Sequence, residues 1–383
     1  MDYAKVLSDL IGIDTSVPPG NNYRKAMEYL APLFEKVGFK TQLVEIPAPE
    51  AEGRSGRVNL VCERRTANKP RLIFYGHADV VPASGWDAFK GKLVEGKIYG
   101  RGAADMKGGI VALLGGLEAV KDRPINYDVA VAITTDEELS QASQLRYLAR
   151  FLEPVKGADV FCLDSNFGFV SVTNLGALHM EIIIKGKSVH SALSHLGVNA
   201  VENAVPLLQA LLELKKEVTA RESKVGTHPD TGLRRMQARL NINMISGGLK
   251  VNIVPDRCVI SLDRRLIPEE NMADAEREIM ACLSSVKGVE WEIGSTVKIP
   301  SLPPSEGPMV DRLAEVIREV IGSTGKFGEM GSGDLSNIVV NDWKANSFGL
   351  GVIRPDSNMH GKDEFVRVKD MESLAKIIER FLT

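Results

Sequence analysis

The feature that most constrains this chain is an apolar run, Val129–Ile133, that leads within three residues into the consecutive acids Asp136-Glu137-Glu138. Such a run is typical of a buried strand, so the acids would crowd together where the strand leaves the sheet. Crowded carboxylates repel one another unless a cation or solvent relieves the charge. The triplet alone therefore fits either a metal site or a solvated acidic loop.

Strand-like and helix-like segments alternate through the first half of the chain. Strands are expected at Arg71–Tyr75, Val129–Ile133 and Val160–Leu163, with a long helix at Met106–Val120. This alternation predicts an α/β fold with a mostly parallel sheet that carries helices on both faces. Ligands bind such sheets beyond the carboxyl ends of the strands. The residues that follow these ends are His77, Glu137, Glu138 and Asp164.

The pattern changes near residue 175. Strands are expected at Leu178–Ile184, Ala238–Met244 and Cys258–Leu262, and helices at Asn199–Leu214 and Ala273–Leu283. This order predicts a separate, smaller α+β unit with an antiparallel sheet. The Lys224–Leu233 segment, with two glycines and a proline, is expected to be a surface loop. We therefore predict one domain formed by residues 1–174 and 296–383, with residues 175–295 inserted into it.

Charge and cysteine content exclude several classes of partner. The formal net charge is −3, and no Lys/Arg run suggests binding to nucleic acid or to an anionic membrane. No run approaches the ~18 apolar residues of a membrane span, and the first residues do not resemble a signal peptide. The four cysteines are scattered without a C-x-x-C pair. Reduced thiols and a cytoplasmic location are therefore expected.

Individual residues give weaker signals. His77 and Asp79 lie two apart in an extended segment, so their side chains share one side and the carboxylate could orient a metal-bound imidazole. Asp105 stands at a helix start, where it could equally be an N-cap. Asp164 could be a turn residue and His360 an ordinary loop histidine. Each residue taken alone has an ordinary structural explanation.

Taken together, these residues resemble the M20 family of co-catalytic metalloamidases and peptidases, in particular its acetylornithine deacetylase and succinyl-diaminopimelate desuccinylase branch. The matching segments, in the order of the family, are Tyr75-Gly-His77-Ala-Asp79, Gly96-Lys-Ile-Tyr-Gly-Arg-Gly-Ala-Ala-Asp105-Met-Lys-Gly-Gly, Thr134-Thr-Asp-Glu137-Glu138, Asp164, and His360-Gly-Lys-Asp-Glu-Phe. The resemblance implies a metallopeptidase catalytic domain and an inserted ferredoxin-like domain that serves as lid and dimerisation domain.

The resemblance also implies a site with two Zn²⁺ ions, for which Co²⁺ could substitute. His77, Asp105 and Asp164 would hold one ion, and Asp105, Glu138 and His360 the other, with Asp105 bridging. Glu137 would take the proton of the attacking water, and Asp79 would orient His77. In this interpretation Asp136 is an ordinary loop residue.

Further matches concern the substrate. By resemblance, His190 would stabilise the tetrahedral oxyanion, often in the partner subunit's active site. Asn252 and Arg265 would contact the substrate, although Arg265 could also form a surface ion pair with Asp263 or Glu269. The loop Gly331-Ser332-Gly333-Asp334 could receive a carboxylate on its amides. The chain departs from the family pattern at three positions, Ser194, Met359 and Asp363.

The expected function is a dinuclear zinc hydrolase that cleaves the amide bond of an N-acyl amino acid, of the deacetylase or desuccinylase type. It would act on a small molecule, without nucleic acid or membrane, as a homodimer through the inserted domain. One alternative is a di- or carboxypeptidase that uses the same site. Another is a non-catalytic binding protein on this fold, which would normally lack a ligand or the general base. Here all five ligand positions and Glu137 are present.

Overall fold

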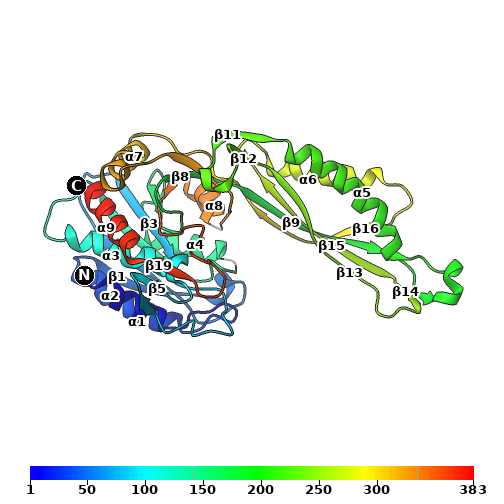
Figure 1. Ribbon diagram of the computed structural model, residues 1–383, viewed down its shortest axis with the longest axis horizontal. Helices are drawn as coiled ribbons and strands as arrows, with labels where there is room; N and C mark the ends of the chain where they lie inside the picture. Colours follow the sequence, from blue (N-terminus) through cyan, green and yellow to red (C-terminus); the bar gives the residue numbers. More distant parts are fainter. Residues whose placement is uncertain (140, 334) are drawn as a thin grey trace. The chain divides into compact units, whose positions relative to one another are not determined.

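The computed structural model describes residues 1–139, 141–333 and 335–383 and divides into two units, which are described separately (Figure 1). Unit 1 comprises Met1–Val172, Ser305–Phe327 and Gly333–Thr383, and unit 2 comprises Thr173–Pro304 and Gly328–Ser332. Unit 2 thus interrupts the chain of unit 1. Among the described residues, no helix is both long and apolar enough to span a membrane.

Unit 1 is built around an eight-stranded mixed sheet. Across the sheet, the strands are β1 (Lys40–Ile46), β2 (Arg57–Arg64), β6 (Asp128–Thr134), β3 (Arg71–His77), β7 (Asp159–Cys162), β18 (Asn346–Gly349), β8 (Val170–Asn174) and β17 (Lys326–Glu329). The central strands β6, β3, β7 and β18 run parallel, whereas β1, β2 and β8 pair antiparallel. Strand β3 is buried along its whole length, as expected for a strand with helices on both faces.

Helices cover this sheet because its parallel strands require crossover connections. Helix α3 (Gly108–Ala119) connects β3 to β6, and α4 (Ala142–Leu148) connects β6 to β7, which lies on the other side of β3. Right-handed crossovers in opposite directions place these two helices on opposite faces. Helix α3 also packs on α9 (Val368–Leu382). At that contact a Cβ on Gly116 would lie 2.8 Å from the Ala375 carbonyl oxygen, so glycine permits the close approach.

The remaining helices of unit 1 are α1 (Tyr3–Ile11), α2 (Tyr23–Lys36), α7 (Pro308–Ile321) and α8 (Leu335–Ile338). The predicted α/β fold class is confirmed. The sequence has no clear signal for β1, because this strand lies at the edge of the sheet and its first three residues, 40–42, are polar and largely open to solvent.

A small antiparallel sheet in unit 1 joins two distant segments. Strands β4 (Lys92–Val94), β5 (Lys97–Tyr99) and β19 (Phe365–Arg367) pair in the order β19-β5-β4. The register places Phe365 opposite Tyr99 and Arg367 opposite Lys97. The residues after β5 and those before β19 are thereby neighbours, although more than 250 positions separate them.

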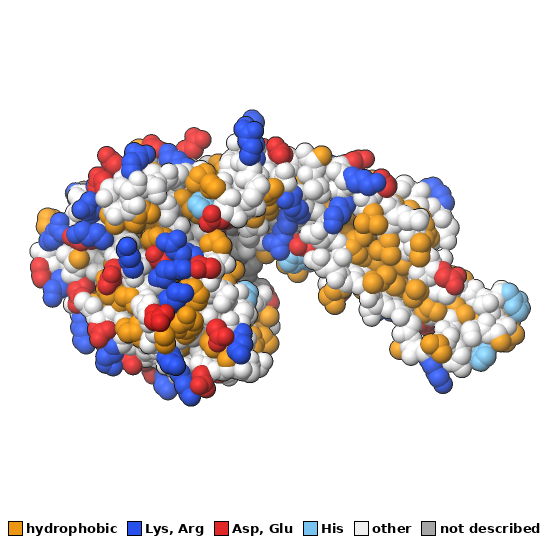
Figure 2. All heavy atoms as spheres, viewed as in Figure 1, with side chains coloured by type: hydrophobic (Ala, Val, Ile, Leu, Met, Phe, Trp, Pro, Cys, Tyr) orange, Lys and Arg blue, Asp and Glu red, His pale blue; other side chains and the backbone are white. Residues whose placement is uncertain are grey.

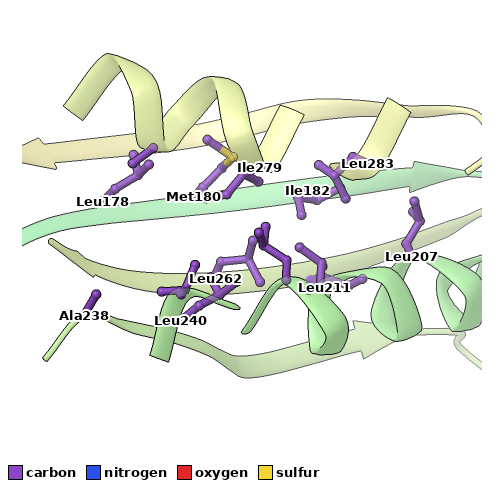
Figure 3. Close-up of a cluster of buried hydrophobic side chains, with 14 of the residues drawn as sticks. Leu178, Met180, Ile182, Leu207, Leu211, Ala238, Leu240, Leu262, Ile279 and Leu283 are labelled. Atoms are coloured by element: carbon purple, nitrogen blue, oxygen red, sulfur yellow. The ribbon is translucent and has the colours of Figure 1, made fainter. Parts of the chain in front are cut away.

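Unit 2 is a four-stranded antiparallel sheet with two long helices. Its strands, in the order β13-β15-β9-β16, are β13 (Arg239–Gly247), β15 (Arg257–Leu266), β9 (Gly176–Lys185) and β16 (Trp291–Ile299), and its long helices are α5 (Ala200–Thr219) and α6 (Met272–Ser285). Figure 3 shows the core, in which Leu178, Met180 and Ile182 of β9 face Leu207 and Leu211 of α5 and Ile279 and Leu283 of α6. The alternating residues, such as His179, lie on the opposite face of the sheet.

Two short pairings complete unit 2. Strand β10 (Val189–His190) pairs with β14 (Ile253–Val254), and β11 (Glu222–Gly226) pairs with β12 (Arg235–Gln237). The prediction of a surface loop over Lys224–Leu233 is therefore wrong for its first three residues, which belong to β11. The glycines and the proline of this segment belong mainly to the turn that follows, and β11 ends before that turn.

Candidate metal centre

The centre begins at the carboxyl ends of three parallel strands. His77 is the last residue of β3, Glu137 follows three residues after β6, and Asp164 two residues after β7. The Nε2 atom of His77 lies 3.8 Å from Asp164 Oδ2 and 4.0 Å from Glu137 Oε2. These three residues form one group whose ligand atoms lie within 4.8 Å of one another, close enough to hold a metal ion.

A second group lies beside the first. Asp105 comes from the irregular segment Ala103–Lys107 that precedes α3, and His360 from the loop before β19. His360 Nε2 lies 2.9 Å from Asp105 Oδ2 and 3.2 Å from Glu138 Oε2. Asp105, Glu138 and His360 likewise place their ligand atoms within 4.8 Å of one another.

The carboxylate of Asp105 connects the two groups. Its Oδ2 faces His360, while its Oδ1 lies 3.3 Å from Nε2 of His77. The structure therefore brings together all five residues predicted as ligands. It differs from the expected first set in that Glu137, and not Asp105, completes the group around His77 and Asp164.

Buried atoms without partners show that this donor set fits metal ions. Among the described residues, neither Nε2 of His77 nor Oε1 of Glu138 has a hydrogen-bond partner, although both atoms are buried. A buried polar atom without a partner costs free energy, which a bound cation would offset. Imidazole nitrogens combined with carboxylate oxygens are the ligands of catalytic zinc sites.

Asp79 forms hydrogen bonds with one residue of each group. The Nδ1–H of His77 donates to the carbonyl oxygen of Asp79 over 3.1 Å, so in the neutral ring it is Nε2 that carries the lone pair. Oδ2 of Asp79 accepts a 3.0 Å hydrogen bond from the backbone N–H of Glu138. One buried residue thus orients a histidine of the first group and the segment that carries Glu138.

The charges of the centre shift one another's pKa in the metal-free chain. Burial, and then the charges of Asp164 and other carboxylates, raises the pKa of Glu137 well above its usual value, against the opposing effect of His77. Hydrogen bonding to Asp105 and then to Glu138 raises the pKa of His360 to about 10. A bound cation would favour the carboxylate form of Glu137 and the neutral form of His360.

Asp136 is not an ordinary loop residue, so that interpretation is wrong. It is fully buried, and its carboxylate accepts hydrogen bonds from Tyr23 Oη (2.7 Å), Arg54 Nε (2.8 Å), Arg57 Nε (2.9 Å) and Gln144 Nε2 (2.9 Å). Its backbone is left-handed, with φ of 65°. Asp136 therefore anchors the loop that presents Glu137 and Glu138. Tyr23 and Arg57, which sequence reasoning missed, lie far away in the chain and carry no local signal of this role.

The residues predicted to contact substrate lie mostly in unit 2. His190 is exposed, and its Nδ1 accepts a 3.2 Å hydrogen bond from Ala192 N–H, so in the neutral ring Nε2 carries the proton. Among the described residues, Asn252 Oδ1 is buried without a hydrogen-bond partner. Arg265 donates to Asp263 Oδ1 over 2.8 Å and to Ser332 Oγ over 2.7 Å.

The glycine-rich loop spans the boundary between the units. Gly331 and Ser332 belong to unit 2, and Gly333 belongs to unit 1. A Cβ on Gly333 would lie 3.3 Å from Oε1 of Glu137, so this glycine borders the metal centre. Asp334 lies outside the described residues. Of the three departures from the family pattern, Met359 beside His360 is an exposed side chain.

Comparisons with known proteins find related sequences. Residues 73–383 match the family described as Peptidase family M20/M25/M40. A succinyl-diaminopimelate desuccinylase from Psychrobacter sp. (strain PRwf-1) is 28% identical over 377 residues, covering 93% of this chain and 89% of that protein. Another, from Xanthomonas campestris pv. campestris, is 30% identical over 358 residues, covering 86% of this chain and 88% of its own.

Solved structures share the fold. The M20 family metallo-carboxypeptidase Sso-CP2 from Sulfolobus solfataricus has a TM-score of 0.77 at 18% identity, with 100% of this chain and 98% of that chain covered. The aminopeptidase PepT from Bacillus cereus has a TM-score of 0.75 at 18% identity, with 99% and 97% covered. At these identities the likeness concerns the fold and carries no information on substrate.

Proposed function

This chain belongs to peptidase family M20/M25/M40, and from that membership we propose that it holds two metal ions and hydrolyses the amide bond of an N-acyl amino acid. That it is a metal-dependent hydrolase follows from the family and from its desuccinylase relatives. The observation that carries the dinuclear proposal is the position of Asp105, whose two oxygens face His77 and His360 separately. A carboxylate in that position suits a bridge between two ions.

The proposed ligands are His77, Asp105 and Asp164 for one ion and Asp105, Glu138 and His360 for the other. Asp105 is preferred to Glu137 in the first set because its Oδ1 lies 3.3 Å from Nε2 of His77, whereas Oε2 of Glu137 lies 4.0 Å away. Zinc is the proposed metal, because histidine and carboxylate are its usual ligands in catalytic sites. Two bound zinc ions would lower the pKa of a water molecule and polarise the amide carbonyl. Three carboxylates that share a partly buried site repel one another, which supports occupation by divalent ions.

Glu137 is the proposed general base and acid. Its side chain belongs to the group around His77 and Asp164 and is 16% exposed, so it can reach a substrate without being freely solvated. It would accept the proton of the attacking water and deliver it to the leaving amine. Asp79 would keep His77 in one tautomer. His190 is proposed to stabilise the oxyanion through its Nε2–H, and Asn252, Arg265 and the 331–333 loop to bind the substrate's polar groups.

An N-acyl amino acid is the proposed substrate because the similar sequences named above are desuccinylases. The test is a metal analysis together with an activity panel on the zinc-loaded chain. The panel comprises N-acetylornithine, N-succinyl-diaminopimelate, other N-acyl amino acids and dipeptides, with Glu137→Gln as the control. We expect close to two Zn²⁺ per chain and hydrolysis of an N-acyl amino acid. Cleavage of dipeptides alone would establish the peptidase alternative, and absence of bound metal after reconstitution would refute the dinuclear site.

A homodimer through unit 2 is also proposed. Strand β13 lies at the edge of its sheet, and Figure 2 shows hydrophobic side chains gathered on this unit. Met244 and Ile245 of β13 are 66% and 54% exposed, and Val205 and Leu212 of α5 are also exposed. An uncovered edge strand flanked by apolar side chains favours pairing with the same edge of a second copy.

The proposed location is the cytoplasm. Cys62 and Cys258 are buried free thiols, and burial raises the pKa of the Cys62 thiol well above its usual value. Such inert thiols suit a reducing compartment.

A further inference from the structure

A buried ion pair links the segment that carries Asp105 to the loop that carries His360. Arg101 and Glu364 have side chains that are 4% and 1% exposed, and Nη1 of Arg101 donates to Oε2 of Glu364 over 2.6 Å. Neither residue is among the proposed ligands or substrate contacts. Taking both charges out of water is costly, so the pair needs further hydrogen bonds to be tolerated.

Glu364 supplies those hydrogen bonds on the Asp105 side. Its Oε2 accepts from the backbone N–H of Gly102 over 3.1 Å, and its Oε1 accepts from those of Ala104 over 2.9 Å and Asp105 over 3.2 Å. Three amides of one irregular turn thus converge on one carboxylate. The backbone of Asp105 itself is fixed by this contact.

Arg101 makes the corresponding hydrogen bonds on the His360 side. Its Nη2 donates to the carbonyl oxygens of His360 over 3.0 Å and Gly361 over 3.2 Å. The backbone of His360 is left-handed, with φ of 60°, and the planar guanidinium reaches both of these carbonyls and Glu364 at once. The strand pairing of β5 with β19 brings the two segments together, but the ion pair makes the direct contacts with the backbones of Asp105 and His360.

We propose that Arg101 and Glu364 are positioning residues that set the spacing between Asp105 and His360 and thereby the affinity of the chain for metal. This inference rests on the proposed dinuclear site. Asp105 faces both histidines, so a shift of its backbone would alter both metal positions, whereas a shift of His360 would alter one. Loss of a residue that orients a metal ligand typically lowers the metal affinity by about 10- to 100-fold.

The test compares Glu364→Gln and Arg101→Lys with a matched pair in the same unit. In Glu364→Gln an amide nitrogen replaces one oxygen and faces N–H donors, and Arg101→Lys keeps the charge but loses the planar fork. Arg71 and Asp128 are the control, since Arg71 is also buried and donates to Asp128 Oδ2 over 3.1 Å and to Leu152 O over 2.9 Å. Arg71 lies at the start of β3, the end opposite His77.

Chelator competition measures the zinc dissociation constants of the full chain. The visible absorption of the Co²⁺-loaded chain reports the geometry of the ligands. Urea unfolding of the metal-free chain reports its stability. We expect Glu364→Gln and Arg101→Lys to weaken at least one binding step by about 10- to 100-fold and to change the Co²⁺ spectrum. Arg71→Lys and Asp128→Asn should lower the urea midpoint and leave both binding steps unchanged.

Wild-type affinities and spectra in folded Glu364→Gln and Arg101→Lys would overturn the inference, as would an equal loss of affinity in Arg71→Lys. If Glu364→Gln does not fold, Arg101→Lys decides by the same measurements. A wild-type chain that binds no metal would instead overturn the proposed function, and this inference with it.

Discussion

Nε2 of His360 lies 2.9 Å from Oδ2 of Asp105. This contact, together with Glu138, raises the pKa of His360 to about 10 in the metal-free chain. His360 therefore holds a proton at neutral pH, whereas metal ligation needs the neutral imidazole. Between pH 7 and pH 9, zinc binding should release this proton, so affinity should rise with pH over that range. Calorimetric titration of zinc in buffers of different ionisation enthalpy measures the number of protons released.

Glu137 and His77 are further sources of protons, because the pKa of each is also raised in the metal-free chain. The same titration of Glu137→Gln separates the contribution of Glu137 from that of the two histidines. Binding heats that do not depend on the buffer would contradict the protonated state of His360.

Glu137 and Glu138 are adjacent, yet they should respond differently to substitution. Glu137→Gln should lower kcat by about 10²- to 10⁴-fold, as expected for loss of a general base, with metal content unchanged. Glu138→Gln should instead lower metal content, because Glu138 belongs to the group with Asp105 and His360. Metal analysis beside steady-state kinetics distinguishes the two. Near-normal kcat in Glu137→Gln would remove this residue as the base.

The contacts of Asp136 predict a large loss of stability on substitution. Asp136→Asn would leave Arg57, whose side chain is 7% exposed, without its counter-charge, and breaking such a buried pair costs about 3–5 kcal/mol. Tyr23→Phe removes one hydrogen bond to a charged group and should cost about 1.5–3 kcal/mol. The free energy of unfolding in urea measures both effects.

Asp342→Asn is the control for Asp136, since Asp342 forms an exposed ion pair with Arg146. Its loss should change stability by less than about 1 kcal/mol. Equal effects in Asp342→Asn and Asp136→Asn would contradict the anchoring role.

The sequence predicted the part of the centre that depends on strand ends. His77, the acidic triplet and Asp164 follow apolar runs, and parallel strands must place their carboxyl ends at one edge. The proximity of Asp105 and His360 came from resemblance, because it depends on the pairing of β5 with β19, two strands of three residues each. Strands that short have no periodic pattern to detect.

The supporting contacts could not be predicted for a related reason. In the sequence, Asp136 is one more acid in a charged run. It is buried because Tyr23, Arg54 and Arg57, which lie in other parts of the chain, donate hydrogen bonds to it. Likewise Glu364 follows a charged loop in the sequence. Its side chain is only 1% exposed, because it accepts hydrogen bonds from three backbone amides that lie far away in the chain. Tertiary packing, which a local pattern does not encode, decides whether such a residue is solvated or buried.

The proposed dimer predicts sensitivity at β13. Ile245→Glu places a charge on the exposed edge and should convert the dimer to monomers in size-exclusion chromatography with light scattering. Leu93→Glu is the matched control, because Leu93 is an aliphatic side chain of unit 1 that is similarly exposed, at 52% against 54%. Dimers that persist in Ile245→Glu would place the interface elsewhere.

His190 offers a test of where the dimer assembles its active site. If His190 acts in the partner's site, a mixed dimer of His190→Ala and Glu137→Gln subunits contains one site with both native residues and one with neither. Random mixing of two inactive variants should then restore about one quarter of wild-type activity, because half of the dimers are mixed and each has one working site. Differently tagged subunits, purified as mixed dimers, should reach about one half. No recovery in demonstrably mixed dimers would mean that His190 acts within its own chain or has no part in turnover.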